Sequence, residues 1–155
     1  MKLVIANRNY SSWSLRPWLL LTQFGIPFEE VVVPFGPTFD DPAWKQVIAQ
    51  YSPAGKVPVL IDGAIHIWES LAILEYVADT RPDLPIWPRD PAARAMARSV
   101  SSEMHAGFSA LRGACPMNLA WIHPARDRGP KVAADVARIT AIWRQARESF
   151  GDEGP

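Results

Sequence analysis

The sequence predicts a mixed α/β domain over residues 1–80, a linker over residues 81–91 and an all-α helical region over residues 92–155. Three observations lead to this fold class. Short apolar runs of strand length alternate with segments of helical periodicity in the first part. Four prolines then interrupt any regular element, at Pro82, Pro85, Pro88 and Pro91. Beyond them, apolar residues recur every three or four positions.

Each element of the α/β part has a local reason. Val and Ile in Lys2–Ala6 favour a buried strand, and Asp62-Gly63 favours a hairpin turn. Because proline is tolerated in the first turn of a helix, Pro17 predicts a helix that begins at Ser14. The elements then follow in the order β-α-β-α-β-β-α, with strands over 2–6, 28–33, 57–61 and 64–68 and helices from residues 14, 42 and 70.

The region after the linker reads as two helices. In the first, apolar side chains recur at helical spacing from Ala93 through Met104 and Phe108 to Leu111. In the second, they recur from Val132 to Phe150. We therefore expect the second part of the chain to be a helical bundle.

Composition excludes several classes of function. The chain has 155 residues, with 16 Lys and Arg against 16 Asp and Glu, and this balance argues against a nucleic-acid partner. No apolar run approaches the roughly 20 residues that span a bilayer, so no membrane partner is expected. Cys115 is the one cysteine, and the three histidines are scattered, so we expect no metal site and a cytoplasmic setting.

The segment Ser11-Ser12-Trp13-Ser14-Leu15-Arg16 lies between a predicted strand and a predicted helix. A serine there is suited to N-capping, and its hydroxyl can also donate a hydrogen bond to an anion at the helix N-terminus. The segment resembles the Ser-Ser-Cys-Ser-Trp-Arg motif of zeta-class glutathione transferases. The resemblance implies that Ser11 is the catalytic serine, with Ser12 as the alternative. The sequence has no Cys-x-x-Cys, so a dithiol mechanism is excluded here.

Two further segments extend this resemblance. Ser52 to Leu60 resembles the Asn-Pro-x-Gly-x-Val-Pro-x-Leu segment of the same family, which implies a cis Val57-Pro58 bond and backbone pairing of Val57 with glutathione. Lys56 is then either a contact for the glycine carboxylate or a solvated side chain. Glu69-Ser70 begins a helix and resembles the family's Glu/Gln-Ser signature. Its carboxylate and hydroxyl suit the ammonium and carboxylate of a γ-glutamyl group, although Ser70 is equally a good N-cap.

The resemblance implies a thioredoxin-like glutathione-binding domain followed by an incomplete helical domain, because the segments that usually follow the last helix would lie beyond Phe150. It places a second-substrate pocket at Trp13, Met104, His105 and Phe108, although Met104 and Phe108 also suit a bundle core. Its implied partners are glutathione as co-substrate, a small hydrophobic electrophile and a second copy of the chain.

The predicted function is therefore that of a glutathione transferase, which activates the glutathione thiol for conjugation to a small electrophile. Two alternatives stay open. One is glutathione-dependent cis-trans isomerisation, as in maleylacetoacetate isomerases. The other is a non-catalytic module that binds glutathione or another ligand, or mediates an interaction.

Overall fold

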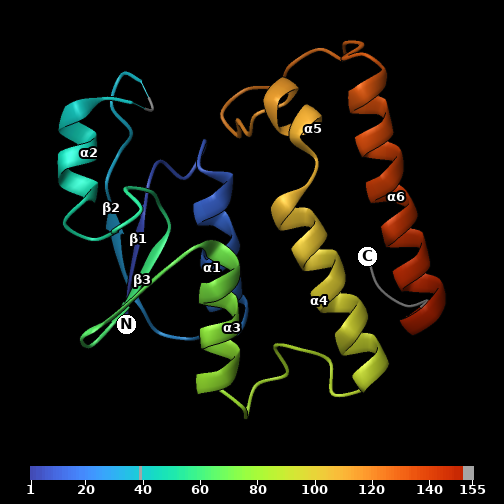
Figure 1. The fold of residues 1–155 in the computed structure, drawn as a ribbon, viewed down its shortest axis with the longest axis horizontal. Coiled ribbons are helices and arrows are strands. Elements are labelled where there is room, and N and C mark those ends of the chain that lie inside the picture. The colour runs from blue at the N-terminus through green and yellow to red at the C-terminus, as the bar shows by residue number, and fades with distance from the viewer. Residues whose placement is uncertain (39, 152–155) are drawn as a thin grey trace. The chain divides into compact units, whose positions relative to one another are not determined.

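The computed structural model describes residues 1–38 and 40–151, and the chain divides into two compact units (Figure 1). The first unit comprises Met1–Leu84 together with Met117–Ala120. The second comprises Pro85–Pro116 and the chain from Trp121 onward. Each unit is described by itself below.

A four-stranded mixed sheet forms the centre of the first unit. Its strands are β1 (Lys2–Ile5), β2 (Glu29–Val32), β3 (Val59–Asp62) and β4 (Ile65–Trp68), in the order β2-β1-β3-β4. β1 is parallel to β2, and the β1–β3 and β3–β4 pairs are antiparallel. The predicted element order is confirmed, but β3 begins two residues later than expected. The residue before it is Pro58, which has no N–H to donate to a ladder.

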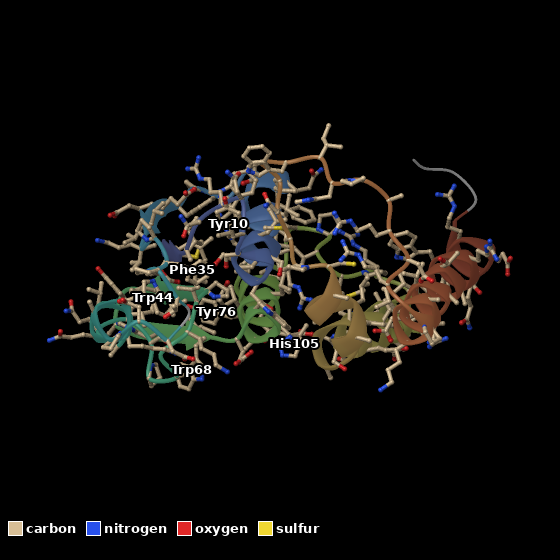
Figure 2. All side chains as sticks on the ribbon, turned by 90° about the horizontal axis from the view of Figure 1, so that it is seen from above. Tyr10, Phe35, Trp44, Trp68, Tyr76 and His105 are labelled. Atoms are coloured by element: carbon tan, nitrogen blue, oxygen red, sulfur yellow. The ribbon has the colours of Figure 1, made fainter. Side chains whose placement is uncertain are left out.

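Helices cover both faces of this sheet (Figure 1). Val4 and Val59 are fully buried against Trp44 and Ile48 of α2 (Pro42–Ile48), with the Phe35 ring 5.4 Å from Trp44 (Figure 2). Because side chains alternate along a strand, the paired residues Leu3 and Leu60 point to the opposite face. There α1 (Ser12–Gln23) packs beside α3 (Ser70–Thr80). Each fully buried aliphatic side chain contributes about 1.5–3 kcal/mol to this core.

The start of α1 differs from the sequence prediction. The helix begins at Ser12 rather than Ser14, which places Pro17 inside the helix rather than in its first turn. Pro17 cannot donate a hydrogen bond to the Trp13 carbonyl, but its ring is fully buried in the core. Burial of this ring in the core therefore outweighs the preference of proline for the first turn of a helix, from which a helix start at Ser14 was predicted.

The second unit contains three helices in its described part rather than the two that were predicted: α4 (Pro91–Ala106), α5 (Ser109–Ala114) and α6 (Pro130–Phe150). The expected continuous helix through Phe108 is wrong, because Gly107 is extended and Phe108 has a left-handed backbone with φ 62°. A Cβ at Gly107 would lie 2.8 Å from the Glu103 carbonyl oxygen, so glycine is required at this break.

Two polar contacts tie α6 to the other helices of this unit. Asp135 Oδ2 accepts a hydrogen bond of 2.9 Å from the Leu111 N–H and so caps α5 from a neighbouring helix. Arg138 donates to both carboxylate oxygens of Glu103 on α4, at 2.6 and 2.7 Å. This hydrogen-bonded pairing lowers the pKa of Glu103 and raises the pKa of Arg138.

In the part of the chain that the structure describes, no helix is both long enough and apolar enough to cross a membrane.

Candidate functional site

The register of the sheet brings the three sequence motifs to one end of it. Val4 of β1 lies opposite Val59 of β3, and Val59 lies opposite Trp68 of β4. The residues just after β1, just before β3 and just after β4 therefore share one edge of the sheet. α1 and α3 begin at this same edge, so two helix N-termini lie beside the start of β3.

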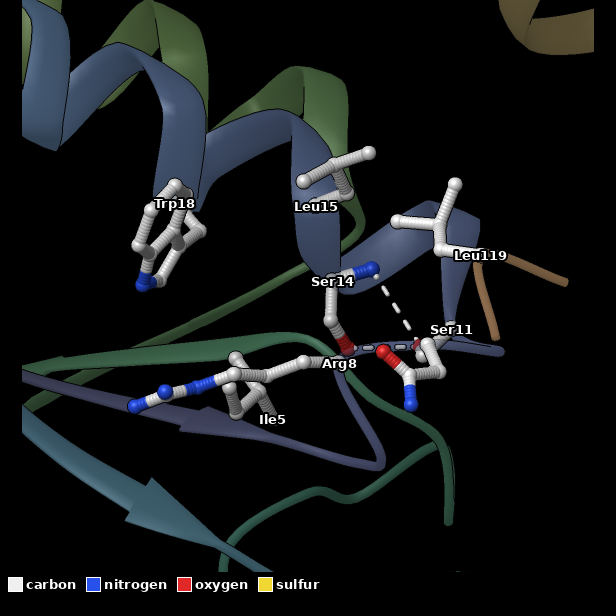
Figure 3. Close-up of a pocket in the computed structure, with 8 residues that line it drawn as sticks. Ile5, Arg8, Ser11, Ser14, Leu15, Trp18 and Leu119 are labelled. Carbon is white, nitrogen blue, oxygen red and sulfur yellow. Dashed lines mark hydrogen bonds between the residues drawn. The ribbon is translucent and has the colours of Figure 1, made fainter. Parts of the chain in front are cut away.

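Two buried serine hydroxyls lie at the N-terminus of α1 (Figure 3). Ser11 is the N-cap, and its Oγ accepts from the Ser14 N–H at 3.4 Å. The Oγ atoms of Ser11 and Ser14 lie 2.7 Å apart, and Ser14 Oγ also accepts from the Ala6 N–H at 3.4 Å. Ser12, the alternative candidate, is the first helical residue and is half-buried. The catalytic roles assigned to Ser11 and Ser12 stay predictions.

A pocket of about 190 Å³ opens beside these hydroxyls (Figure 3). Its apolar walls come from Ile5, Leu15, Trp18 and Leu119, and Ser11 and Ser14 add their side chains. The pocket therefore places an apolar space next to a polar helix N-terminus.

The polar rim of this pocket is held by β2 and by a distant segment. Arg8 also lines the pocket, and Arg8 Nε and Trp18 Nε1 donate to the two carboxylate oxygens of Glu30 at 2.7 and 2.9 Å. The Leu119 N–H donates to the Asn9 carbonyl at 3.2 Å, which ties residues 117–120 to the first unit. Sequence reasoning missed this pocket, because no local pattern links residue 119 to residue 9.

The second motif has the geometry that the resemblance implies. The Val57-Pro58 peptide bond is cis, and Pro58 is buried. Ser52 is 1% exposed, and its Oγ accepts from the Lys56 N–H at 3.3 Å, which holds the loop before β3. Lys56 itself is exposed.

The third motif lies at an uncapped helix N-terminus. Glu69 rather than Ser70 is the N-cap of α3, and no side chain caps this helix. Glu69 has φ 69°, a strained conformation for a residue with a side chain, which costs about 1–3 kcal/mol. Ser70 is 1% exposed, and its Oγ has no hydrogen-bond partner within the described part of the chain. The expectation that Ser70 caps α3 is therefore wrong, and its buried hydroxyl is left without an acceptor.

The predicted second-substrate residues are divided between the two units. Trp13 lies on α1 in the first unit, with the Arg16 guanidinium 4.2 Å from its ring centroid. Met104, His105 and Phe108 lie in the second unit. We expected Met104 and Phe108 to lie on successive turns of one helix, but the helix ends before Phe108. The assignment of these four residues to a substrate pocket stays a prediction.

Among the described residues, no group of three or more His, Cys, Asp or Glu side chains is arranged to hold a metal ion.

Comparison with known proteins agrees with this arrangement. Residues 10–80 match the sequence model of the glutathione S-transferase N-terminal domain. Residues 10–80 therefore belong to the glutathione S-transferase N-terminal domain family. It is 44% identical over 68 residues to a probable maleylacetoacetate isomerase of Caenorhabditis elegans, covering 43% of this chain and 31% of that protein. It is 35% identical over 106 residues to the maleylacetoacetate isomerase of Rattus norvegicus, covering 68% of this chain and 47% of that protein.

A solved glutathione S-transferase shares the fold. The theta-class glutathione S-transferase of Xanthomonas axonopodis pv. citri, solved with glutathione bound, superposes with a TM-score of 0.60 at 25% identity. The match covers 95% of this chain and 69% of that one. The chain thus spans less than half the length of the two isomerase relatives and about two thirds of this transferase.

Proposed function

We propose that the first unit binds glutathione at the edge of the sheet where α1 and α3 begin, and that the protein is a glutathione transferase. The observation that carries this proposal is the uncapped start of α3 with the buried hydroxyl of Ser70. Native proteins leave few buried polar groups unpaired, so such a hydroxyl indicates a missing partner. A carboxylate fits, since it accepts from backbone N–H groups and a hydroxyl at once.

The neighbouring residues complete a site for a γ-glutamyl tripeptide. In this proposal the Glu69 carboxylate receives the ammonium group, while Ser70 and the start of α3 receive the γ-glutamyl carboxylate. The backbone of Val57 pairs with the cysteinyl residue, as an added strand pairs with a sheet edge. Lys56, which is exposed beside this loop, receives the glycine carboxylate.

In this proposal Ser11 activates the glutathione thiol by stabilising its thiolate form. A free thiol with a pKa near 8.5 is only about 3% ionised at pH 7. Lowering that pKa by about two units requires roughly 2.7 kcal/mol of preferential stabilisation of the thiolate. One charge-assisted hydrogen bond from Ser11 and the positive end of α1 together supply an energy of this size.

The pocket beside Ser11 is the proposed site for the electrophile. An apolar cavity of about 150 Å³ accommodates benzene, so a pocket of about 190 Å³ suits a single ring or a short alkyl chain. The thiolate attacks the electrophilic carbon, a C–S bond forms, and the leaving group departs with its electron pair. The protein contributes binding and orientation, and glutathione is the nucleophile.

Isomerisation is the second candidate, and the names of the two relatives above favour it. In that reaction the same thiolate adds to a conjugated double bond, a single bond rotates, and the thiolate leaves again. No glutathione is consumed. A cis-configured dienone substrate therefore separates the two activities, because isomerisation proceeds with a catalytic quantity of glutathione while conjugation stops when glutathione is used up.

The experiment that tests the proposal is calorimetric titration with reduced glutathione, followed in the same sample by a conjugation assay with a monocyclic aromatic halide and the dienone assay. Binding with turnover supports a transferase or an isomerase. Binding without turnover of either substrate leaves the non-catalytic module. Failure to bind glutathione, in a sample shown to be folded by circular dichroism, overturns the proposal. We also propose that the active protein is a homodimer, which sedimentation of the same sample tests.

A further inference from the structure

The paired hydroxyls at the start of α1 allow their protons to be assigned. A serine hydroxyl has one proton to donate and two lone pairs that accept. Ser14 Oγ already accepts from the Ala6 N–H, and Ser11 Oγ already accepts from the Ser14 N–H. The remaining question is which of the two hydroxyls donates across their 2.7 Å contact.

The position of the proposed thiolate decides the direction of this hydrogen bond. Ser14 is 2% exposed and Ser11 is 5% exposed, and both side chains line the pocket, so burial does not separate the two hydroxyls. If Ser11 donated to Ser14 instead, its one proton would not be available to the thiolate that the proposed function places beside it. Ser11 lines the pocket, so its own proton has access to a ligand or to solvent. Donation from Ser14 to Ser11 is therefore favoured.

This direction restricts what Ser11 can bind. With both lone pairs filled, by the Ser14 N–H and the Ser14 hydroxyl, Ser11 Oγ has only its proton left to offer. Such a hydroxyl is a pure donor, and it favours an anion over a neutral group that must itself donate. The donation from Ser14 also polarises the Ser11 O–H bond, which strengthens its own hydrogen bond.

We infer that Ser14 is a positioning residue that directs the Ser11 hydroxyl proton toward the bound glutathione thiolate and so lowers the pKa of that thiol. The inference rests on the proposed function, because it assumes that glutathione binds with its sulfur beside Ser11. Ser14 does not touch the thiolate in this scheme and acts only through Ser11.

The test is the pKa of the glutathione thiol bound to the 155-residue chain, measured from the ultraviolet absorbance of the thiolate as a function of pH. In Ser14→Ala we expect the pKa of this thiol to rise by about 0.5–1 unit, with about 1.5- to threefold less thiolate at pH 7. Adding Ser14→Ala to Ser11→Ala should produce no further rise, since Ser14 acts through Ser11. The matched control is Thr22→Ala, which removes an exposed hydroxyl elsewhere on α1 and should leave this pKa unchanged.

A second pair of variants covers the case in which Ser14→Ala does not fold. Ser14→Thr and Ser14→Val have the same shape and differ by the hydroxyl, so the thiol pKa should be higher in Ser14→Val. An unchanged pKa in Ser14→Ala, equal values in the Thr and Val variants, or an additive effect on top of Ser11→Ala would overturn the inference. Those outcomes would leave glutathione binding intact. If the wild-type chain neither bound glutathione nor lowered its thiol pKa, the proposed function would fail together with the inference.

Discussion

Replacing Ser70 with alanine should change stability and ligand binding in opposite directions. The Ser70 hydroxyl is 1% exposed and has no partner in the described structure, and an unpaired buried hydroxyl costs about 1–3 kcal/mol. Alanine is also the better helix former at the start of α3. We therefore expect Ser70→Ala to raise the free energy of unfolding of the ligand-free protein by about 0.5–1.5 kcal/mol, which urea denaturation measures.

Glutathione binding should weaken in the same variant. A hydrogen bond from a hydroxyl to a carboxylate contributes about 1.5–3 kcal/mol, so its loss should raise the dissociation constant about 10- to 150-fold in calorimetry.

Ser52 provides the matched control for stability. It is also 1% exposed, but its hydroxyl is paired with the Lys56 N–H. Ser52→Ala should therefore lower the free energy of unfolding by about 1 kcal/mol. If both alanine variants were destabilised alike, or if Ser70→Ala bound glutathione as tightly as the wild type, the assignment of Ser70 as a ligand-binding hydroxyl would be refuted.

Three further predictions concern other polar groups. Ser11→Ala should raise the pKa of the bound glutathione thiol by about 1–2 units, and Ser12→Ala should change it far less; equal loss, or loss in Ser12→Ala alone, would contradict the choice of Ser11. Because its arginine partner on α6 lowers the pKa of Glu103, that ion pair stabilises the fold above the carboxyl's ordinary pKa of 4.5 and loses its effect as pH falls through the lowered value. At low salt the urea midpoint of the wild type should exceed that of Glu103→Gln near neutral pH, with a gap that closes in acid; a gap independent of pH would argue against this pairing. Asp135→Ala leaves the Leu111 N–H of α5 without its cap and should cost about 1 kcal/mol, while Asp135→Asn should cost less, and amide hydrogen exchange at Leu111 would register both.

The sequence was most informative where structure depends on neighbouring residues. The order of strands and helices in the first unit follows from apolar runs, Asp62-Gly63 and the spacing of prolines, and the structure confirms it. The motifs at Ser11, Val57 and Ser70 lie at the sheet edge that β-strand pairing dictates. These features depend on neighbouring residues or on the pairing register of the strands. The alternation of apolar residues along each strand already restricts that register.

What the sequence missed depends on contacts between distant residues. The α1 start at Ser12 places Pro17 inside the helix with its ring buried in the core, and the break after α4 places Gly107 against the Glu103 carbonyl, where a Cβ would not fit. Apolar periodicity runs straight through Phe108, because that side chain is buried whether or not the helix continues. The approach of Leu119 to Asn9 leaves no trace in local pattern or composition.

The two helix N-termini at the sheet edge differ in a way that suits them to different halves of glutathione. At α1 the Ser11 hydroxyl accepts from the Ser14 N–H and, in the inferred arrangement, also from the Ser14 hydroxyl, so its side chain has a proton to offer and no lone pair to fill. A single donor of this kind suits a sulfur anion. At α3 no side chain caps the helix, so backbone N–H groups and the Ser70 hydroxyl can donate together. Several convergent donors suit the two oxygens of a carboxylate, and this difference in capping sets the direction in which we propose that the tripeptide lies.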